Sequence, residues 1–191
     1  TIGVVTKPFK FEGRKRMKNA LEGIEELIDK VDSLVTIPND RLLEIASKEM
    51  TMKEAFEYAD DILRQGVQGI ADTITKNAMI NLDFADVRST MQNTGTALMG
   101  VGVGKGEDRA VAAAKAAISS PLLETSIEGA TALLINISGQ NPTLMETQEA
   151  VDYINDATGG EPDVIFGVID DPGAKDDIKV TVIATGFARQ P

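Results

Sequence analysis

The stretch Thr51-Met52-Lys53-Glu54 opens the segment around which this chain is organised, and Asn81-Leu82-Asp83-Phe84-Ala85-Asp86-Val87 closes it. A Thr followed three positions later by Glu forms the pattern of a capping box, which predicts that a helix begins there. Apolar or small residues then recur at helical spacing, without a proline, to about residue 75. They are Ala55, Ala59, Ile62, Leu63, Gly66, Ile70 and Ile74. We therefore predict a long central helix within residues 51–76.

An amide and two carboxylates follow this helix in the pattern N-x-D-x-x-D, namely Asn81, Asp83 and Asp86. Spacing alone leaves two interpretations open. In the first, Asp83 is the N-cap of a short helix over residues 84–91, and Asp86 lies in its first turn, where the helix dipole favours a negative charge. In the second, the three side chains orient and polarise a water molecule for attack on a substrate.

The composition excludes several classes of site. The 191 residues include no cysteine and no histidine, which removes zinc sites of the usual type, Ser-His triads and thiol nucleophiles. We assign no metal-ligating residues. A net charge of -11 argues against a nucleic-acid partner, which requires a basic surface. No apolar run has transmembrane length and no signal-peptide pattern is present, so we expect no transmembrane segment.

The pattern of elements indicates an α/β fold. Before the long helix come a strand, a helix and a strand, near residues 1–6, 11–31 and 33–37, which form a parallel βαβ unit. A parallel sheet is normally buried on both faces, so this unit needs more strands than it supplies. The order after residue 95 is βαβαββ, which predicts a mixed sheet with helices on one face. The expected elements lie near residues 96–103, 109–119, 131–137, 143–157, 163–169 and 178–184.

The one glycine-dense stretch is Gly100-Val101-Gly102-Val103-Gly104-Lys105-Gly106. It matches neither G-x-G-x-x-G nor G-x-x-x-x-G-K-[ST], the phosphate-binding patterns. Because it lies in a predicted strand and the loop after it, we interpret its glycines as close-packing positions.

The helix that ends in Asn-Leu-Asp-Phe-Ala-Asp-Val resembles the one that carries the catalytic loop of FtsZ, the prokaryotic relative of tubulin. Asp86 fits FtsZ better than tubulins, which have Glu at the last acidic position of that loop. Further stretches resemble FtsZ in the same order along nearly the whole chain. They are Thr6-Lys7-Pro8-Phe9, Phe11-Glu12-Gly13-Arg14-Lys15-Arg16, Ile37-Pro38-Asn39-Asp40-Arg41-Leu42, Gly66-Val67-Gln68-Gly69-Ile70, Ala117-Ile118-Ser119-Ser120-Pro121-Leu122-Leu123 and Val182-Ile183-Ala184-Thr185-Gly186-Phe187.

This resemblance implies a domain organisation. Residues 1–50 would be a remnant of the parallel, Rossmann-like GTP-binding domain, and residues 51–76 the central core helix. Residues 77–191 would hold the catalytic loop and the C-terminal activating domain with its mixed sheet. The glycine-rich half that holds the GTP phosphates in FtsZ is missing, so we expect that it was cut away or is supplied as a separate polypeptide.

The resemblance also implies which residues contact GTP or GDP. Glu12 and Arg16 would face the ribose and phosphate side, although their i, i+4 spacing is also that of a surface ion pair. Asn39 ends a strand at the carboxyl edge of a parallel sheet, where α/β proteins place ligands. Phe56 would stack on guanine while Asp60 accepts hydrogen bonds from its donor edge. Spacing alone favours a core Phe beside a solvated Asp.

The implied function is that of a GTPase that polymerises head to tail and builds the cell-division ring, a cytoplasmic structure at midcell. Asn81, Asp83 and Asp86 would act on the GTP of the neighbouring subunit, with Mg2+ neutralising the phosphates. Expected partners are further FtsZ subunits, the missing N-terminal half and division regulators. We expect this chain alone to be inactive. The alternative is a non-catalytic interaction module that docks on or caps a filament.

Overall fold

The computed structural model of the chain describes residues 1–45, 49–75, 84–92, 95–120, 123, 127–170, 173 and 176–186. Its strands are β1 (Ile2–Lys7), β2 (Ser33–Pro38), β3 (Gly95–Lys105), β4 (Ala132–Gly139), β5 (Asp163–Asp170) and β6 (Asp177–Thr185). Its helices are α1 (Arg14–Ile28), α2 (Asn39–Ile45), α3 (Met52–Thr75), α4 (Phe84–Met91), α5 (Arg109–Ile118) and α6 (Leu144–Ala157). The predicted α/β class and the βαβαββ order after residue 95 are confirmed. Helix α2 was not predicted.

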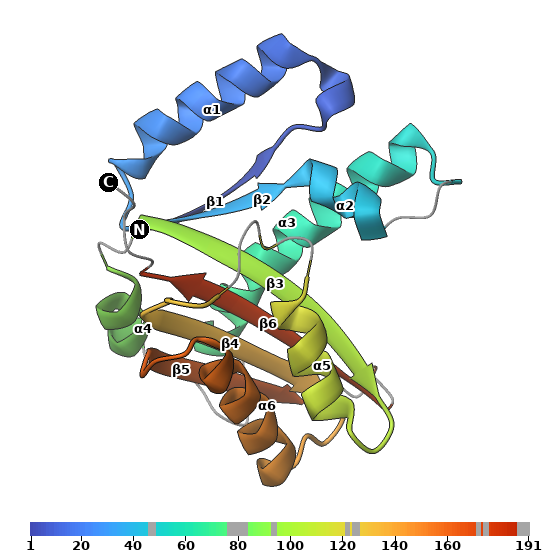
Figure 1. Cartoon of the computed structure of the whole chain (residues 1–191), viewed down its shortest axis with the longest axis vertical. Coiled ribbons are helices and arrows are strands. Elements are labelled where there is room, and N and C mark those ends of the chain that lie inside the picture. Colours follow the sequence, from blue (N-terminus) through green and yellow to red (C-terminus); the bar gives the residue numbers. More distant parts are fainter. Residues whose placement is uncertain are drawn as a thin grey trace.

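All six strands form one sheet in the order β1-β2-β3-β6-β4-β5 (Figure 1). The first three strands run parallel, β6 is antiparallel to both of its neighbours, and β5 is parallel to β4. The additional strand that the N-terminal unit needs is β3, whose Gly95 to Ala97 pair with Ser33 to Val35 of β2. The parallel βαβ unit and the later mixed sheet are therefore continuous.

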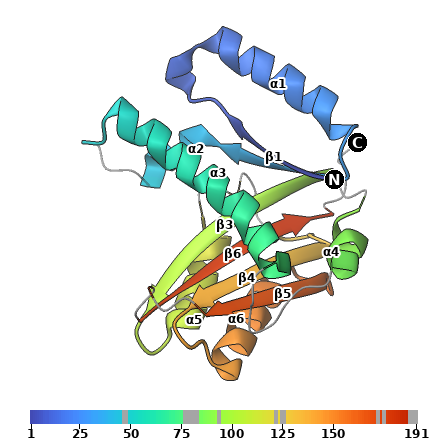
Figure 2. The same ribbon diagram turned by 180° about the vertical axis from the view of Figure 1, so that it is seen from behind.

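The two helices of the βαβαββ unit lie on one face of the mixed sheet, as predicted, and α3, which precedes this unit, covers the other face (Figures 1 and 2). Figures 1 and 2 show α5 and α6 on one face and α3 on the other, with α1 beyond the β1 edge. Along β4, Leu133 and Ile135 belong to the core under α5 and α6, whereas Leu134 belongs to the core under α3. This alternation is the two-residue period of a strand. It allows one sheet to serve two hydrophobic cores.

Helix α3 begins with the predicted capping box. The Thr51 hydroxyl accepts from the Glu54 amide at 3.2 Å, and the Glu54 carboxylate accepts from the Thr51 amide at 3.4 Å. The helix has 24 residues and is therefore about 36 Å long. Even so, neither α3 nor any other described helix is long and apolar enough to span a membrane.

Helix α1 is shorter than predicted, and much of it is exposed. A 3-10 turn at Lys10–Glu12 precedes it, and Gly13, with φ at 104°, separates the turn from the helix. A helix that began near residue 11 could not pass through this positive φ, which explains the later start at Arg14. None of its apolar residues is fully buried, and Leu21 is 48% exposed.

Gly100, Gly102 and Gly104 of β3 are close-packing positions, as predicted, whereas the same prediction for Gly106 is wrong, because a Cβ atom there would meet nothing within 4 Å and its φ is 83°. A Cβ atom at Gly100 would overlap the backbone carbonyl of Ala117, and one at Gly102 would overlap that of Ala113. Both alanines are completely buried in α5. The missing side chains let α5 lie directly on β3. Gly100, Gly102, Gly104 and the facing alanines of α5 form what we call the glycine–alanine seam.

Arg109 joins four parts of the C-terminal unit. Its guanidinium donates two hydrogen bonds to the Glu146 carboxylate, one of them 3.0 Å from Nη2 to Oε1. It also donates to the carbonyls of Gln140 and Asp176, at 3.2 and 3.3 Å. The hydrogen bonds within the pair lower the pKa of Glu146 and raise that of Arg109 from their ordinary values. Glu146 also closes the capping box of α6 with Thr143.

The seam gives a stability prediction. Gly102→Ala forces a Cβ atom into the Ala113 carbonyl, so we expect it to lower the free energy of unfolding by about 1–3 kcal/mol or more. Urea denaturation of the chain, followed by circular dichroism, measures this loss. The matched control is Gly23→Ala in α1, where the added Cβ would meet nothing within 4 Å beyond its neighbours and the backbone of its own helix, and a gain of roughly 0.5–1 kcal/mol is expected. Equal stability of the two variants would contradict the packing role.

Candidate nucleoside-binding site

A cavity of about 320 Å3 lies at the carboxyl ends of β1 and β2, between α1 and the first half of α3. Its volume is within the range of small-molecule sites, roughly 300–1,000 Å3. All five predicted nucleoside contacts line it. The lining residues are Thr6, Pro8, Glu12, Arg16, Ala20, Asn39, Phe56, Ala59, Asp60 and Leu63. The structure therefore brings together predicted contacts that are up to 48 positions apart in the sequence, from Glu12 to Asp60.

Helix α3 presents one of its faces to the cavity. Phe56, Ala59, Asp60 and Leu63 follow the i, i+3, i+4, i+7 spacing of a single helical face. Ala59 is buried, whereas Phe56 is 39% exposed. The alternative of a buried core Phe is therefore wrong, and the ring is accessible from the cavity.

Glu12 is held by the turn that precedes α1. Its carboxylate accepts a hydrogen bond from the Phe9 amide at 2.8 Å, and its side chain is only 10% exposed. Arg16 Nε lies 3.3 Å from Glu12 Oε1, while the rest of the Arg16 side chain extends into solvent. The pair is thus an i, i+4 ion pair, as its spacing indicates, with the acid fixed and the guanidinium reaching outward.

Asn39 is the most informative residue of the site. It is 6% exposed, and its side-chain Oδ1 has no hydrogen-bond partner in the part of the chain that the structure describes. A buried acceptor without a partner costs about 1–3 kcal/mol. Such a group at the wall of a cavity is satisfied when a ligand donates to it.

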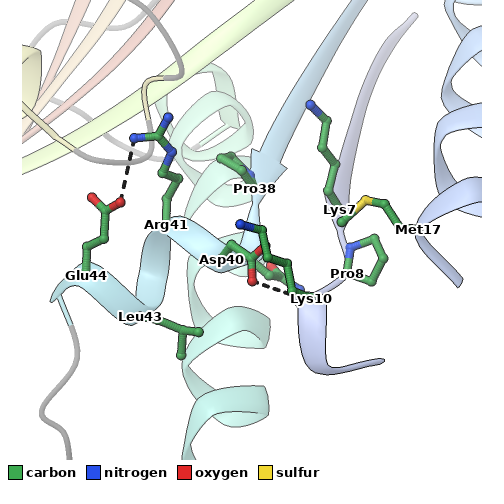
Figure 3. A pocket seen from close by; sticks show the side chains of 10 residues that line it. Lys7, Pro8, Lys10, Met17, Pro38, Asp40, Arg41, Leu43 and Glu44 are labelled. Atoms are coloured by element: carbon green, nitrogen blue, oxygen red, sulfur yellow. Dashed lines mark hydrogen bonds and ion pairs between the residues drawn. The ribbon is translucent and has the colours of Figure 1, made fainter. Parts of the chain in front are cut away.

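A second cavity, of about 570 Å3, shares Pro8 and Asn39 with the first. Figure 3 shows it between the end of β1, the start of α1 and helix α2. Asp40 Oδ1 accepts from the Lys10 amide at 2.9 Å, and Arg41 lies 3.7 Å from Glu44. The contact of Asp40 with Lys10 attaches α2 to the turn before α1 and so fixes the wall that carries Asn39, whereas the Arg41–Glu44 pair lies within α2.

The predicted catalytic residues cannot be placed in the same way. Asn81 and Asp83 lie outside the described residues, and of Asp86 only the backbone, within α4, is described. The short helix over residues 84–91, on which the N-cap interpretation rested, is confirmed as α4. The roles of all three side chains stay predictions.

Sequence reasoning missed half of the cavity lining. Ala59 and Leu63 could have been found, because they share the helical face of Phe56 and Asp60. Thr6 and Pro8 follow the same logic as Asn39, since they lie at the carboxyl end of a parallel strand. Ala20 carries no chemical signal that points to a ligand.

Two family models match the chain. The FtsZ family, C-terminal domain, covers residues 95–188, and the Tubulin/FtsZ family, GTPase domain, covers residues 1–47. Two structures of FtsZ from M. jannaschii, an empty dimer and a point mutant, are 41% identical to the chain, with TM-scores of 0.91 and 0.93. They match 97% and 98% of this chain. The GDP-bound monomer of CetZ1 from Haloferax volcanii matches 100% of it and shares the fold at 18% identity and a TM-score of 0.77.

Fold and comparisons together define a tubulin-like α/β chain, in which one cavity gathers the residues predicted to contact a nucleoside. The chain belongs to the tubulin/FtsZ family, and within it to FtsZ. It spans about half the length of the solved proteins that it matches, between 54% and 56%.

The unpaired Asn39 acceptor gives a second prediction. Asn39→Ala removes a buried polar atom that no described group satisfies, so we expect the free energy of unfolding to change by less than about 1 kcal/mol. The control is Thr147→Ala, which removes a hydroxyl that donates to the Thr143 carbonyl at 3.1 Å and should cost about 0.5–1.5 kcal/mol. Urea denaturation of both variants measures the difference. A larger loss for Asn39→Ala would show that the amide is structural.

Proposed function

We propose that the intact protein is a tubulin-like GTPase that assembles head to tail. The observation that carries the proposal is the cavity that all five predicted nucleoside contacts line, one of which, Asn39, has an unpaired acceptor Oδ1. Membership of the FtsZ family supports it. One FtsZ structure that the chain matches is described as a dimer, and the CetZ1 structure as GDP-bound.

Guanine recognition follows from the lining of the cavity. Phe56 offers an exposed ring on which a purine can stack, and Asp60 lies one helical turn further along the same face. Its carboxylate accepts hydrogen bonds from the N1-H and 2-amino groups of guanine, whereas adenine has no donor at these two positions. Asn39 Oδ1 accepts a further hydrogen bond from the base or the ribose.

The phosphates require groups that these residues do not supply. Among the described residues that line the cavity, Arg16 is the one cation. No described cluster of three or more carboxylates could hold a metal ion. Mg2+ is often bound through substrate phosphates with one or two carboxylates, so it would depend on the phosphates of GTP. We therefore propose that this chain alone is inactive and that the glycine-rich half of the domain completes the site.

Catalysis is proposed to be shared between subunits. Phe56 lies near the start of α3, and the helix continues for about 28 Å beyond it, to Thr75. Asn81, Asp83 and Asp86 come later still in the sequence. If this spacing holds in the intact protein, the acidic residues cannot reach the nucleotide of their own subunit. They would instead orient water against the γ-phosphate of the next subunit.

The remaining assignments rest on the family resemblance. We propose the division of the chain into residues 1–50, 51–76 and 77–191, a cytoplasmic protein at the midcell division ring, and division regulators as further partners. The cell-division role and septation follow from the same resemblance.

A second candidate function is a non-catalytic module that docks on a filament end and caps it. The incomplete nucleotide cavity favours this function. A head-to-tail filament grows only while every subunit offers both of its contact faces, so a subunit with one incomplete face would end it. The two functions differ in one experiment, in which this chain is added to nucleotide-loaded intact subunits. New GTP turnover supports the catalytic role, whereas shorter filaments without new turnover support capping.

Asp60 gives the prediction for base recognition. We expect Asp60→Ala in the intact protein to weaken GDP binding by roughly 10- to 100-fold, because a charged acceptor of two hydrogen bonds is lost. Calorimetry with GDP and with IDP, which lacks the 2-amino group, measures this loss and its base dependence. The wild type should prefer GDP, and the variant should bind both alike.

The matched control for this prediction is Asp61→Ala. Asp61 is the next residue of α3, does not line the cavity, and pairs with Arg64 at 2.8 Å. Its loss should leave GDP affinity unchanged. If both variants lose affinity equally, the loss comes from the changed charge of the helix, and the proposed contact between Asp60 and the base is wrong.

Asp83 gives the prediction for shared catalysis. We expect Asp83→Ala in the intact protein to lower turnover by about 100-fold or more while GDP affinity stays unchanged. Mixing it with the Asp60→Ala protein should restore part of the turnover, because one variant supplies bound GTP and the other an intact loop. GTPase assays of each variant alone and of the mixture measure this. A mixture as inactive as its parts would contradict catalysis between subunits.

A further inference from the structure

Three phenylalanine rings meet beside the nucleoside cavity. Phe9 and Phe11 are stacked, with centroids 4.9 Å apart and planes 11° apart. Phe56 contacts both rings edge to face, at 5.6 Å and 89° from Phe9 and at 5.9 Å and 87° from Phe11. Both arrangements are preferred geometries of aromatic pairs. The cluster joins the turn before α1 to the first half of α3.

The three rings differ in what they face. Phe9 is completely buried, Phe11 is 48% exposed, and Phe56 is 39% exposed. Phe56 lines the cavity, and the other two rings do not. Phe56 therefore has one surface toward the cavity, while Phe9 and Phe11 pack against it elsewhere. Phe11 is 48% exposed, but its contacts with Phe9 and Phe56 hold its ring in place.

The turn that carries Phe11 is itself fixed. The Phe9 amide donates to the Glu12 carboxylate at 2.8 Å, and the Glu12 amide donates to the Phe9 carbonyl at 3.1 Å. Gly13 then ends the turn at a φ of 104°. These contacts hold Phe9 and Phe11 on one side of the turn and the Glu12 carboxylate in the cavity wall.

We propose that Phe11, stacked on Phe9, is a positioning residue that fixes the plane of Phe56 for stacking on the nucleotide base. The proposal rests on the proposed function of the cavity. A lone Phe on a helix samples several rotamers, and a ligand that stacks on it must immobilise the ring. Two rings set at right angles to Phe56 restrict that motion before the ligand arrives. Binding then loses less free energy to immobilising the Phe56 ring, and the affinity is higher.

The first test compares GDP affinities of the intact protein by calorimetry. Phe11→Ala should weaken binding roughly fivefold, the change in Kd that corresponds to the interaction free energy of one aromatic pair. Phe11→Tyr should retain wild-type affinity because it keeps the ring. The control is Leu21→Ala, which removes an apolar side chain of the same exposure, 48%, from outside the cavity. At saturating GTP, kcat of Phe11→Ala should equal that of the wild type while KM rises. Thermal melting of each variant verifies that it is folded.

The second test is a double-mutant cycle. If Phe11 acts through Phe56, then Phe11→Ala should cause no more than about a twofold further loss in a Phe56→Ala background. Full additivity of the two losses, failure of Phe11→Tyr to restore affinity, or an equal loss in Leu21→Ala each overturns the proposal and leaves the proposed function standing. An unchanged GDP affinity of Phe56→Ala alone would instead reject the base-binding cavity itself, and the role of Phe11 with it.

Discussion

The packing of α3 against the sheet is the contact on which the rest of the structure depends. Small residues make it close: Ala55 and Ala59 are buried in the same core as Val35, Ala97 and Met99. These partners come from β2 and β3, the two strands that join the parallel unit to the mixed sheet. One helix thus fixes how the two units meet. Its exposed face carries the nucleoside contacts at one end, and its length sets the distance to the segment that holds Asp83.

The sequence predicts much of this arrangement because its signals are local. Two capping boxes, at Thr51 and Thr143, form as the spacing indicates. The positions of the strands follow from short apolar runs between turns. The i, i+4 spacings of Glu12 with Arg16 and of Phe56 with Asp60 place each pair on one helix face. The assignment of these pairs to a nucleotide came from the family resemblance, since spacing alone favoured a surface ion pair and a core Phe.

What could not be predicted depends on contacts between distant residues. Helix α2 has seven residues, too few for a hydrophobic period to stand out. The pairing of Ser33 with Gly95 joins strands that are far apart in sequence, and neither strand carries a signal for its partner. The unpaired state of Asn39 Oδ1 is a property of what surrounds the amide. The same holds for the Phe9, Phe11 and Phe56 cluster, since its geometry depends on a tight turn at Gly13.

The glycine–alanine seam has a consequence for how this domain can vary. Because Gly100 and Gly102 of β3 have no side chains, backbone atoms of α5 occupy the space where side chains would stand. A larger side chain on either side of the seam would clash with backbone atoms, and a change of side-chain rotamer cannot relieve such a clash. Divergence at this interface requires paired changes that shift the whole helix outward. The opposite face of the sheet, with larger and more adaptable side chains such as Met99, is where homologues can accumulate core changes one at a time.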